Sequence, residues 1–187
     1  MASTDFIKWS GVAALIGGAL YSALSLLSGY RAPLLYALLA LGAMAATVAL
    51  HALQKMHYGL SGTLASWTTF VGLAMIFASS PLGWLGPLFE APAIISFLLG
   101  LLVTFAGMLA LGALTVRARV VPWWCGLALV VGGFGFGGGL VGDWVLGLGG
   151  SVYFDTLVLS EGVPWIVVGY AVLRAGGERT ERPSRVR

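Results

Sequence analysis

The sequence predicts an all-α integral membrane protein, built as a bundle of six transmembrane helices. Of its 187 residues, 59% are hydrophobic and only 9% are charged, and the mean hydropathy is +0.96. A soluble domain carries roughly a quarter charged residues, so these charges are too few to coat a water-soluble protein. The remaining apolar surface is expected to face lipid, and the composition excludes a soluble enzyme.

The helices follow from the stretches that lack charge, because a spanning helix needs about 20 mainly apolar residues. Five stretches without Asp, Glu, Lys or Arg are long enough: 9–30, 32–54, 56–89, 91–116 and 120–142. A sixth stretch, beginning near Val152, is long enough only if Asp155 and Glu161 lie inside it. We therefore expect one membrane domain, residues 1–173, with spans near 7–27, 34–53, 63–83, 93–116, 122–141 and 152–173. The basic tail 174–187 is expected to be cytoplasmic and disordered.

Short connections join these spans, so no soluble domain is expected between them. The connections are 28–33, 54–62, 117–121 and 142–151. A longer one, residues 80–92, contains Pro81, Pro87 and Pro92. Proline stiffens a chain and interrupts helices, so this segment is predicted to form an outer cap at the membrane interface.

The basic residues set the orientation, because loops that carry Lys and Arg stay in the cytoplasm. With both termini inside, every Lys and Arg except Arg31 lies on the cytoplasmic side. The basic inner face is expected to attract anionic lipid headgroups. The excess of arginine over lysine and the 28 glycines are typical of a GC-rich bacterial genome. The predicted location is the bacterial cytoplasmic membrane.

Aromatic residues agree with this topology, since Trp and Tyr concentrate at the two headgroup levels. Tyr21 and Trp165 are the exceptions that sit deeper. The inner group is Trp9, Tyr58, Trp67, Trp123, Trp124 and Tyr170, and the outer group is Tyr30, Tyr36, Trp84, Trp144 and Tyr153.

Glu161 is the one charged residue that the topology does not require. It lies roughly 13 Å along the sixth span, near the bilayer centre, where a carboxylate costs at least about 2.5 kcal/mol. It is expected to be neutral, paired, or turned toward water or protein. Pro164 follows within one turn and is predicted to kink the helix beside it. Glu161 either lines a functional cavity or proton path, or makes a structural hydrogen bond to a neighbouring helix or subunit.

Three other acids lie on the predicted outer side. Asp155 is about 120° from Glu161 around the helix, so the two do not form a dyad, and Asp155 is expected to be hydrated. Glu90, between Pro87 and Pro92, either guards an outer vestibule or is a solvated loop acid. Asp143 follows the glycine-rich fifth span. Together with Glu161, these residues form the predicted proton- or solute-binding set.

Glycines dominate the end of the fifth span, residues 132–142. One interpretation is close helix packing, because small residues four apart let another helix approach. The other is local unwinding near 137–139, which would expose backbone groups next to Asp143. A G-x-G-x-x-G match here lacks the strand that a dinucleotide fold requires. The residues concerned are Gly133, Gly135, Gly137, Gly138 and Gly139.

No cofactor or metal site is predicted. His51 and His57 lie about 120° apart on one helix and cannot easily share an ion, so with Lys55 they are interpreted as interface residues. Cys125 is predicted to be a small core residue, and nucleic-acid binding is not supported.

Three function classes follow. The first is a small transporter or solute-binding protein that uses Glu161 to exchange a proton or to pair a cationic or polar solute. The second is a non-enzymatic subunit, in a homo- or hetero-oligomer, that packs through its glycine-rich face. The third is an intramembrane enzyme acting on a lipid-soluble substrate. No nucleophile with a base at usable spacing supports it, so an enzyme is the less favoured class.

Overall fold

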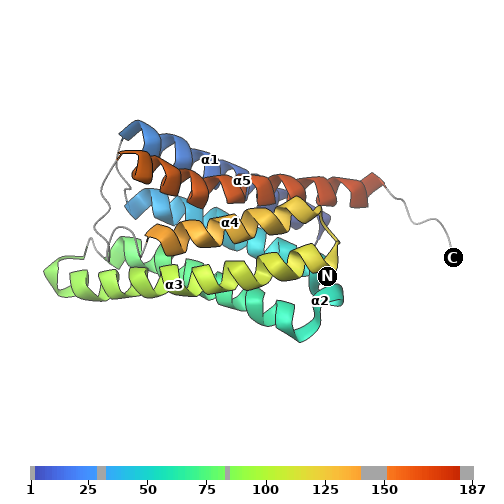
Figure 1. Cartoon of the computed structure of the whole chain (residues 1–187), viewed down its shortest axis with the longest axis horizontal. Helices are drawn as coiled ribbons and strands as arrows, with labels where there is room; N and C mark the ends of the chain where they lie inside the picture. The colour runs from blue at the N-terminus through green and yellow to red at the C-terminus, as the bar shows by residue number, and fades with distance from the viewer. Residues whose placement is uncertain (1–2, 29–32, 83–84, 140–150, 182–187) are drawn as a thin grey trace.

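The computed structural model describes residues 3–28, 33–82, 85–139 and 151–181, in which every regular element is a helix. The predicted all-α fold is confirmed for these residues. In chain order the helices are α1 (Thr4–Ser28), α2 (Pro33–Leu82), α3 (Pro87–Ala118), α4 (Trp123–Gly139) and α5 (Ser151–Glu181). They lie side by side along one long axis (Figure 1).

Four of the described helices are long and apolar enough to cross a membrane, which indicates a membrane protein. The described part of α4, Trp123–Gly138, is apolar but shorter. The four apolar stretches are Thr4–Leu27, Leu34–Leu82, Leu88–Ala118 and Val158–Glu178.

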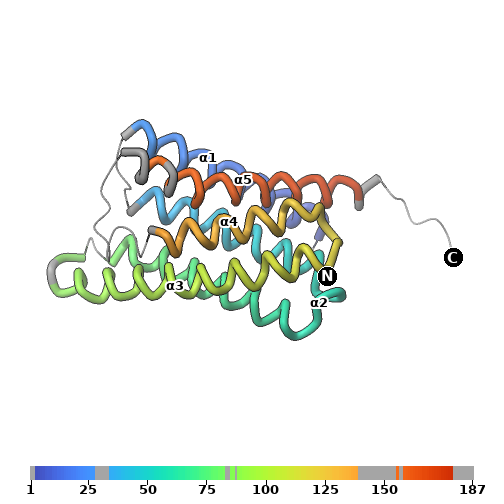
Figure 2. Tube along the Cα trace, in the orientation of Figure 1, coloured from blue at the N-terminus to red at the C-terminus, as the bar shows by residue number. Residues whose placement is uncertain are grey.

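Helix α2 reverses direction at Gly59, whose backbone angles are φ 57° and ψ −144°. Such a conformation is open essentially only to glycine. The predicted connection 54–62 is therefore helical apart from this one residue. The two legs of α2, residues 33–58 and 60–82, run back along each other (Figure 2).

The bundle has two ends, and we call the one where α1 begins and α5 ends the terminal end. The terminal end holds the start of α1, the bend at Gly59, the turn between α3 and α4, and the end of α5 (Figure 1). Arg119 forms that turn in a left-handed conformation, with φ 52°, and donates its backbone N–H to the carbonyl of Thr115. The opposite end holds the start of α2, the start of α3 and the start of α5.

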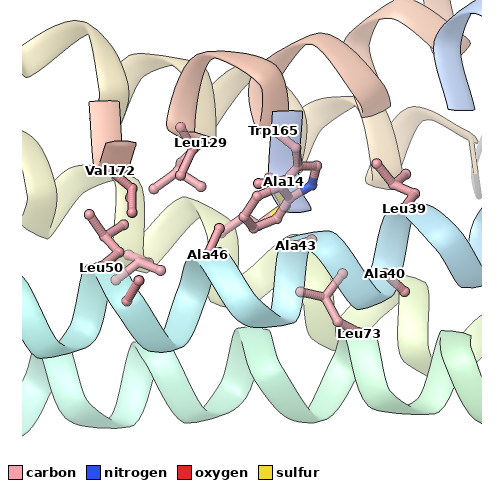
Figure 3. Close-up of a cluster of buried hydrophobic side chains, with 14 of the residues drawn as sticks. Ala14, Leu39, Ala40, Ala43, Ala46, Leu50, Leu73, Leu129, Trp165 and Val172 are labelled. Atoms are coloured by element: carbon pink, nitrogen blue, oxygen red, sulfur yellow. The ribbon is translucent and has the colours of Figure 1, made fainter. Parts of the chain in front are cut away.

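The helices close into a ring. Helix α1 packs against α2 and α5, α3 packs against α2 and α4, and α4 packs against α5. Helix α2 also reaches α5 across the ring. An apolar layer fills the centre, where Trp165 of α5 lies beside the small side chains of Ala43 and Ala46 of α2 (Figure 3).

Two expected boundaries differ from the structure. Helix α5 continues past Leu173 to Glu181, so the tail is helical in the segment 174–181. A salt bridge of 3.1 Å between Arg174 and Glu178, one turn apart, stabilises this extension. The expected cap 80–92 is also shorter, since Pro81 is in the last turn of α2 and Pro87 begins α3. Proline suits the first turn of a helix because the missing N–H would be unpaired there anyway.

Candidate functional site

Glu161 lies inside the helix bundle, with only 1% of its surface exposed. It is about 15 Å along α5 from Ser151, at 1.5 Å per residue. Leaving a carboxylate in such surroundings without hydrogen bonds would cost several kcal/mol. The groups that hydrogen-bond to this carboxyl therefore determine whether it can bind or release a proton.

Two tyrosines from other helices donate hydrogen bonds to Glu161. The hydroxyl of Tyr21, on α1, donates to Oε2. The hydroxyl of Tyr36, on the first leg of α2, lies 3.1 Å from Oε2 and 3.3 Å from Oε1. Three helices thus meet at one carboxyl group.

Aromatic packing holds the phenols in place. The rings of Tyr21 and Tyr36 have centroids 5.1 Å apart at a tilt of 55°. Tyr36 also meets Phe97 of α3 edge to face, at 5.0 Å. Tyr21 is fully buried and Tyr36 nearly so. Both are therefore fixed by packing as well as by their hydrogen bonds.

Glycines bring the backbones close enough for these contacts. A Cβ atom on Gly18 would lie 2.7 Å from the carbonyl oxygen of Gly162, the residue after Glu161. A Cβ atom on Gly42 would lie 2.5 Å from the carbonyl oxygen of Ala13. Backbone contact at these crossings leaves Tyr21, one turn after Gly18, within reach of the acid.

Two further buried groups near Glu161 have unused hydrogen-bonding capacity. The hydroxyl of Ser22 lies against Gly162, 2.1 Å from where a Cβ atom would stand. The indole nitrogen of Trp165 belongs to the residue one turn beyond Glu161. Within the described part of the chain, Ser22 Oγ and Trp165 Nε1 have no hydrogen-bond partner. Buried polar groups of this kind commonly bind water or a ligand.

This arrangement can hold or release a proton without leaving Glu161 unsatisfied. An ionised carboxylate only accepts hydrogen bonds, and the two phenol O–H groups supply them. A protonated carboxyl also donates one, and a phenol oxygen can accept it. Loss of the proton would leave a negative charge in an apolar setting, which favours the entry of a cation or a polar solute.

Two of the other predicted acids, Asp155 and Glu90, do not join Glu161. Asp155 is exposed on α5, and Glu90 is exposed in the first turn of α3 rather than on a loop. Both lie toward the opposite end of the bundle, whereas Asp143 is outside the described residues. Among the described residues, the structure therefore brings Glu161 together with tyrosines instead of with Asp155 or Glu90.

Tyr21 and Tyr36 are the site residues that the sequence did not identify. Tyr36 fitted the outer aromatic belt, yet its side chain turns into the bundle. Tyr21 gave a usable signal, because it sits too deep for the headgroup level. A deep tyrosine and a deep acid in one apolar chain indicate a hydrogen-bonded pair.

The glycine-rich part of α4 packs against two neighbouring helices. Cβ atoms added at Gly133 and Gly137 would meet Phe105 or Leu109 of α3, and one at Gly135 would meet Ser160 of α5. Helix α4 is continuous to Gly139 and so includes Gly138. These contacts match the packing interpretation rather than the unwound one.

Pro164 lies inside α5, which remains helical around it. Its ring cannot donate the backbone hydrogen bond that would end on the carbonyl of Ser160. A Cβ atom on Gly132 of α4 would stand 3.0 Å from the Pro164 ring. Close contact with α4 thus covers the interrupted part of the helix.

Polar side chains at the terminal end link neighbouring helical segments. His51 Nδ1 lies 3.1 Å from the hydroxyl of Tyr58, which lies 3.2 Å from Ser66 Oγ. Thr115 of α3 donates to Gln54 Oε1 at 3.2 Å. Among the described residues, no group of three or more His, Cys, Asp or Glu side chains could hold a metal ion.

Comparisons with protein-family models, with curated proteins and with solved structures found no match. The geometry of the site is therefore the basis for a functional proposal.

Proposed function

We propose that this chain is a six-span protein of the bacterial cytoplasmic membrane, with both termini in the cytoplasm. The 50 residues of α2 would extend about 75 Å as a straight helix, against about 30 Å of hydrocarbon. The bend at Gly59 divides this length into two legs that each suit one crossing. With α1, α3, α4 and α5, the two legs make six spans.

The charges support this orientation. Lys8, Lys55, Arg117 and Arg119 lie toward the terminal end, whereas Glu90 lies at the opposite end. Retention of basic loops in the cytoplasm favours the terminal end as the inner one. Anionic headgroups of the inner leaflet are then the expected surroundings of these cations.

Within this frame, we propose that the protein is a small transporter or solute-binding protein. The observation that carries the proposal is the buried carboxyl of Glu161, which accepts hydrogen bonds from Tyr21 and Tyr36 on two other helices. Glu161 exchanges a proton for a cation or a polar solute that enters from the outer side. Acids inside membrane spans commonly mark such pathways.

The alternative of a non-enzymatic assembly subunit rested on the glycine-rich face of α4. Within the chain itself, Gly133 and Gly137 lie against α3 and Gly135 lies against α5, so these three glycines give less support to this alternative. The further alternative, an enzyme acting on a lipid-soluble substrate, has no assigned residues. The transport or binding proposal is therefore preferred.

Proteoliposomes that enclose a pH-sensitive dye test this proposal. Gradients of sodium, potassium, ammonium and small organic amines would be imposed on vesicles containing the full chain. We expect at least one cation to drive proton movement in the wild type, and Glu161→Gln to abolish it. Glu178→Gln, which changes an exposed acid near the other end of the same helix, is the control and should retain the signal.

Unfolding temperature and size-exclusion profile would establish that each variant is folded. Folded Glu161→Gln protein that still behaves as the wild type with every cation would contradict the assigned role of Glu161. If none of these cations drives proton movement through the wild-type protein, and none raises its unfolding temperature, both transport and binding would be contradicted.

A further inference from the structure

A separate polar cavity lies at the terminal end, beside the bend in α2. It has a volume of about 380 Å³ and is formed by α2 and the last turns of α3. This volume is within the range of small-molecule sites, about 300–1,000 Å³. The lining residues are His57, Tyr58, Ser61, Leu114, Arg117 and Ala118.

The polar groups at this cavity are mainly hydrogen-bond donors. Arg117 supplies a guanidinium group and His57 an imidazole. Both side chains are exposed, and within the described ranges neither forms an ion pair or a hydrogen bond. Unused donors of this kind match a ligand that only accepts hydrogen bonds.

The backbone adds to this preference. Because Gly59 interrupts α2, the second leg, residues 60–82, begins beside the cavity, which Ser61 lines. The first N–H groups of a helical segment lack partners within the helix and attract anions. The hydroxyl of Ser61 lies on the same turn and donates a hydrogen bond to the carbonyl of Tyr58 at 3.0 Å, so its oxygen remains an acceptor.

The local charge is positive. Helix α2 contains no acidic residue, and the only acid of α3 is Glu90. Glu90 is about 40 Å from Arg117 along that helix, at 1.5 Å per residue. Lys55 and Arg119 flank the cavity in sequence without lining it. An anion here would meet no carboxylate from either helix that forms the cavity.

Apolar side chains surround the bend and indicate the kind of anion. Met56, Leu60, Leu64 and Trp67 are all exposed on α2 near the cavity. They would contact acyl chains when this end of the bundle is at the inner leaflet. A free phosphate ion would gain nothing from them, whereas a phospholipid would use both surfaces.

We propose that this cavity binds the phosphate group of an anionic phospholipid, with Arg117 as the charged contact and His57 as a hydrogen-bond donor. Arg117 can bind two phosphate oxygens at once, while an imidazole N–H of His57 can donate to a third. The lipid as occupant depends on the membrane orientation proposed above, but the anion chemistry does not. The site is also independent of Glu161.

Binding can be measured on the purified full chain in a non-ionic detergent. Short-chain phosphatidylglycerol, short-chain phosphatidylcholine and inorganic phosphate would be titrated separately, with native mass spectrometry and unfolding temperature as readouts. We expect saturable binding of phosphatidylglycerol, weaker binding of phosphatidylcholine and little effect of phosphate. Arg117→Gln should weaken phosphatidylglycerol binding about tenfold, as expected for loss of a charge-assisted hydrogen bond.

Two controls separate the cavity from general surface charge. Lys55→Gln and Arg119→Gln remove the same charge at neighbouring positions and should change the affinity less than about twofold. His57→Gln is a second cavity variant and should weaken binding several-fold. Because Arg117 and His57 are exposed, both variants should unfold at the wild-type temperature without lipid.

Several results would overturn the proposal. Equal effects of Arg117→Gln and Lys55→Gln would indicate attraction by net charge alone. Equal binding of phosphatidylcholine would remove the preference for an anion, and equal binding of inorganic phosphate would make the ligand a free ion. Glu161→Gln should bind phosphatidylglycerol as the wild type does, so this proposal can fail or hold apart from the proposed function.

Discussion

The chemistry of the Glu161 carboxyl group depends on the side chains that surround it. A buried carboxyl with donors from two helices is both a stabilising contact and a chemical group ready to change its protonation. A hydrogen bond to a charged group contributes about 1.5–3 kcal/mol net. Removing a donor also leaves the acid partly unsatisfied, so Tyr21 and Tyr36 should matter for stability as well as for proton binding.

We expect Tyr21→Phe and Tyr36→Phe each to lower the free energy of unfolding by about 1.5–3 kcal/mol, because each removes one donor to Glu161. The double variant should lose less than the sum, since both phenols serve the same carboxyl group. Chemical unfolding in mild detergent measures these values. Tyr170→Phe, at an exposed position on α5, is the control and should change stability by less than about 0.5 kcal/mol. Fully additive losses would argue against a shared acceptor.

At the scale of helices, glycines set where α1 and α5 touch. Gly11 faces Gly169 and Gly18 faces Gly162, and a Cβ atom added at Gly11 or Gly18 would stand 2.7 Å from the carbonyl oxygen of the opposite glycine. In both helices the two glycines are seven residues apart, so they fall on one face. This matched spacing aligns the antiparallel helices and brings Tyr21 to Glu161.

Gly18→Ala should therefore separate α1 from α5 and lower the free energy of unfolding by about 1–3 kcal/mol, as overpacking does. Gly177→Ala is the matched control, because a Cβ atom there meets nothing within 4 Å. It should raise stability by up to about 1 kcal/mol, since alanine favours a helix more than glycine does. Unfolding curves of the two variants give the comparison. Similar losses for both would show that close contact at Gly18 is not the cause.

For the molecule as a whole, an apolar layer separates the two polar regions. Along α2, Ala43, Ala46 and Leu50 are fully buried and lie between Tyr36 and Gln54. Trp165 and Val172 of α5 fill the same layer (Figure 3). Thr47 is a buried polar residue in this stretch of α2, but its hydroxyl donates to the carbonyl of Ala43 in its own helix at 2.8 Å. Transport would require the layer to rearrange.

The proposed topology gives a prediction at this scale. Reporter fusions after Lys55 and Arg119 should report the cytoplasm, and fusions after Arg31, Glu90 and Asp143 should report the outer side. The physical reason is that basic loops resist translocation. Enzymatic reporters that are active on only one side of the membrane provide the measurement. A cytoplasmic signal after Glu90 would contradict the six-span topology.

The spacing of charges predicted most of the helical segments, because membrane helices are local structures defined by length and polarity. The ends were less certain, as the extension of α5 to Glu181 demonstrates. The ion pair between Arg174 and Glu178 supports this extension, and a hydropathy pattern does not reveal such a pair. The direct passage from one leg of α2 to the other depended on a backbone angle at Gly59, which composition does not encode.

The sequence by itself determined that this is an apolar, helical chain and that Glu161 is its one unexplained charge. Both conclusions follow from the cost of placing charge in hydrocarbon, which depends on composition and position alone. Only the tertiary structure decided that Tyr21 and Tyr36, 140 and 125 residues away, complete the site. Such contacts depend on how each helix is rotated and offset against its neighbours. That geometry is set by backbone contacts at glycines and by the packing of the whole ring.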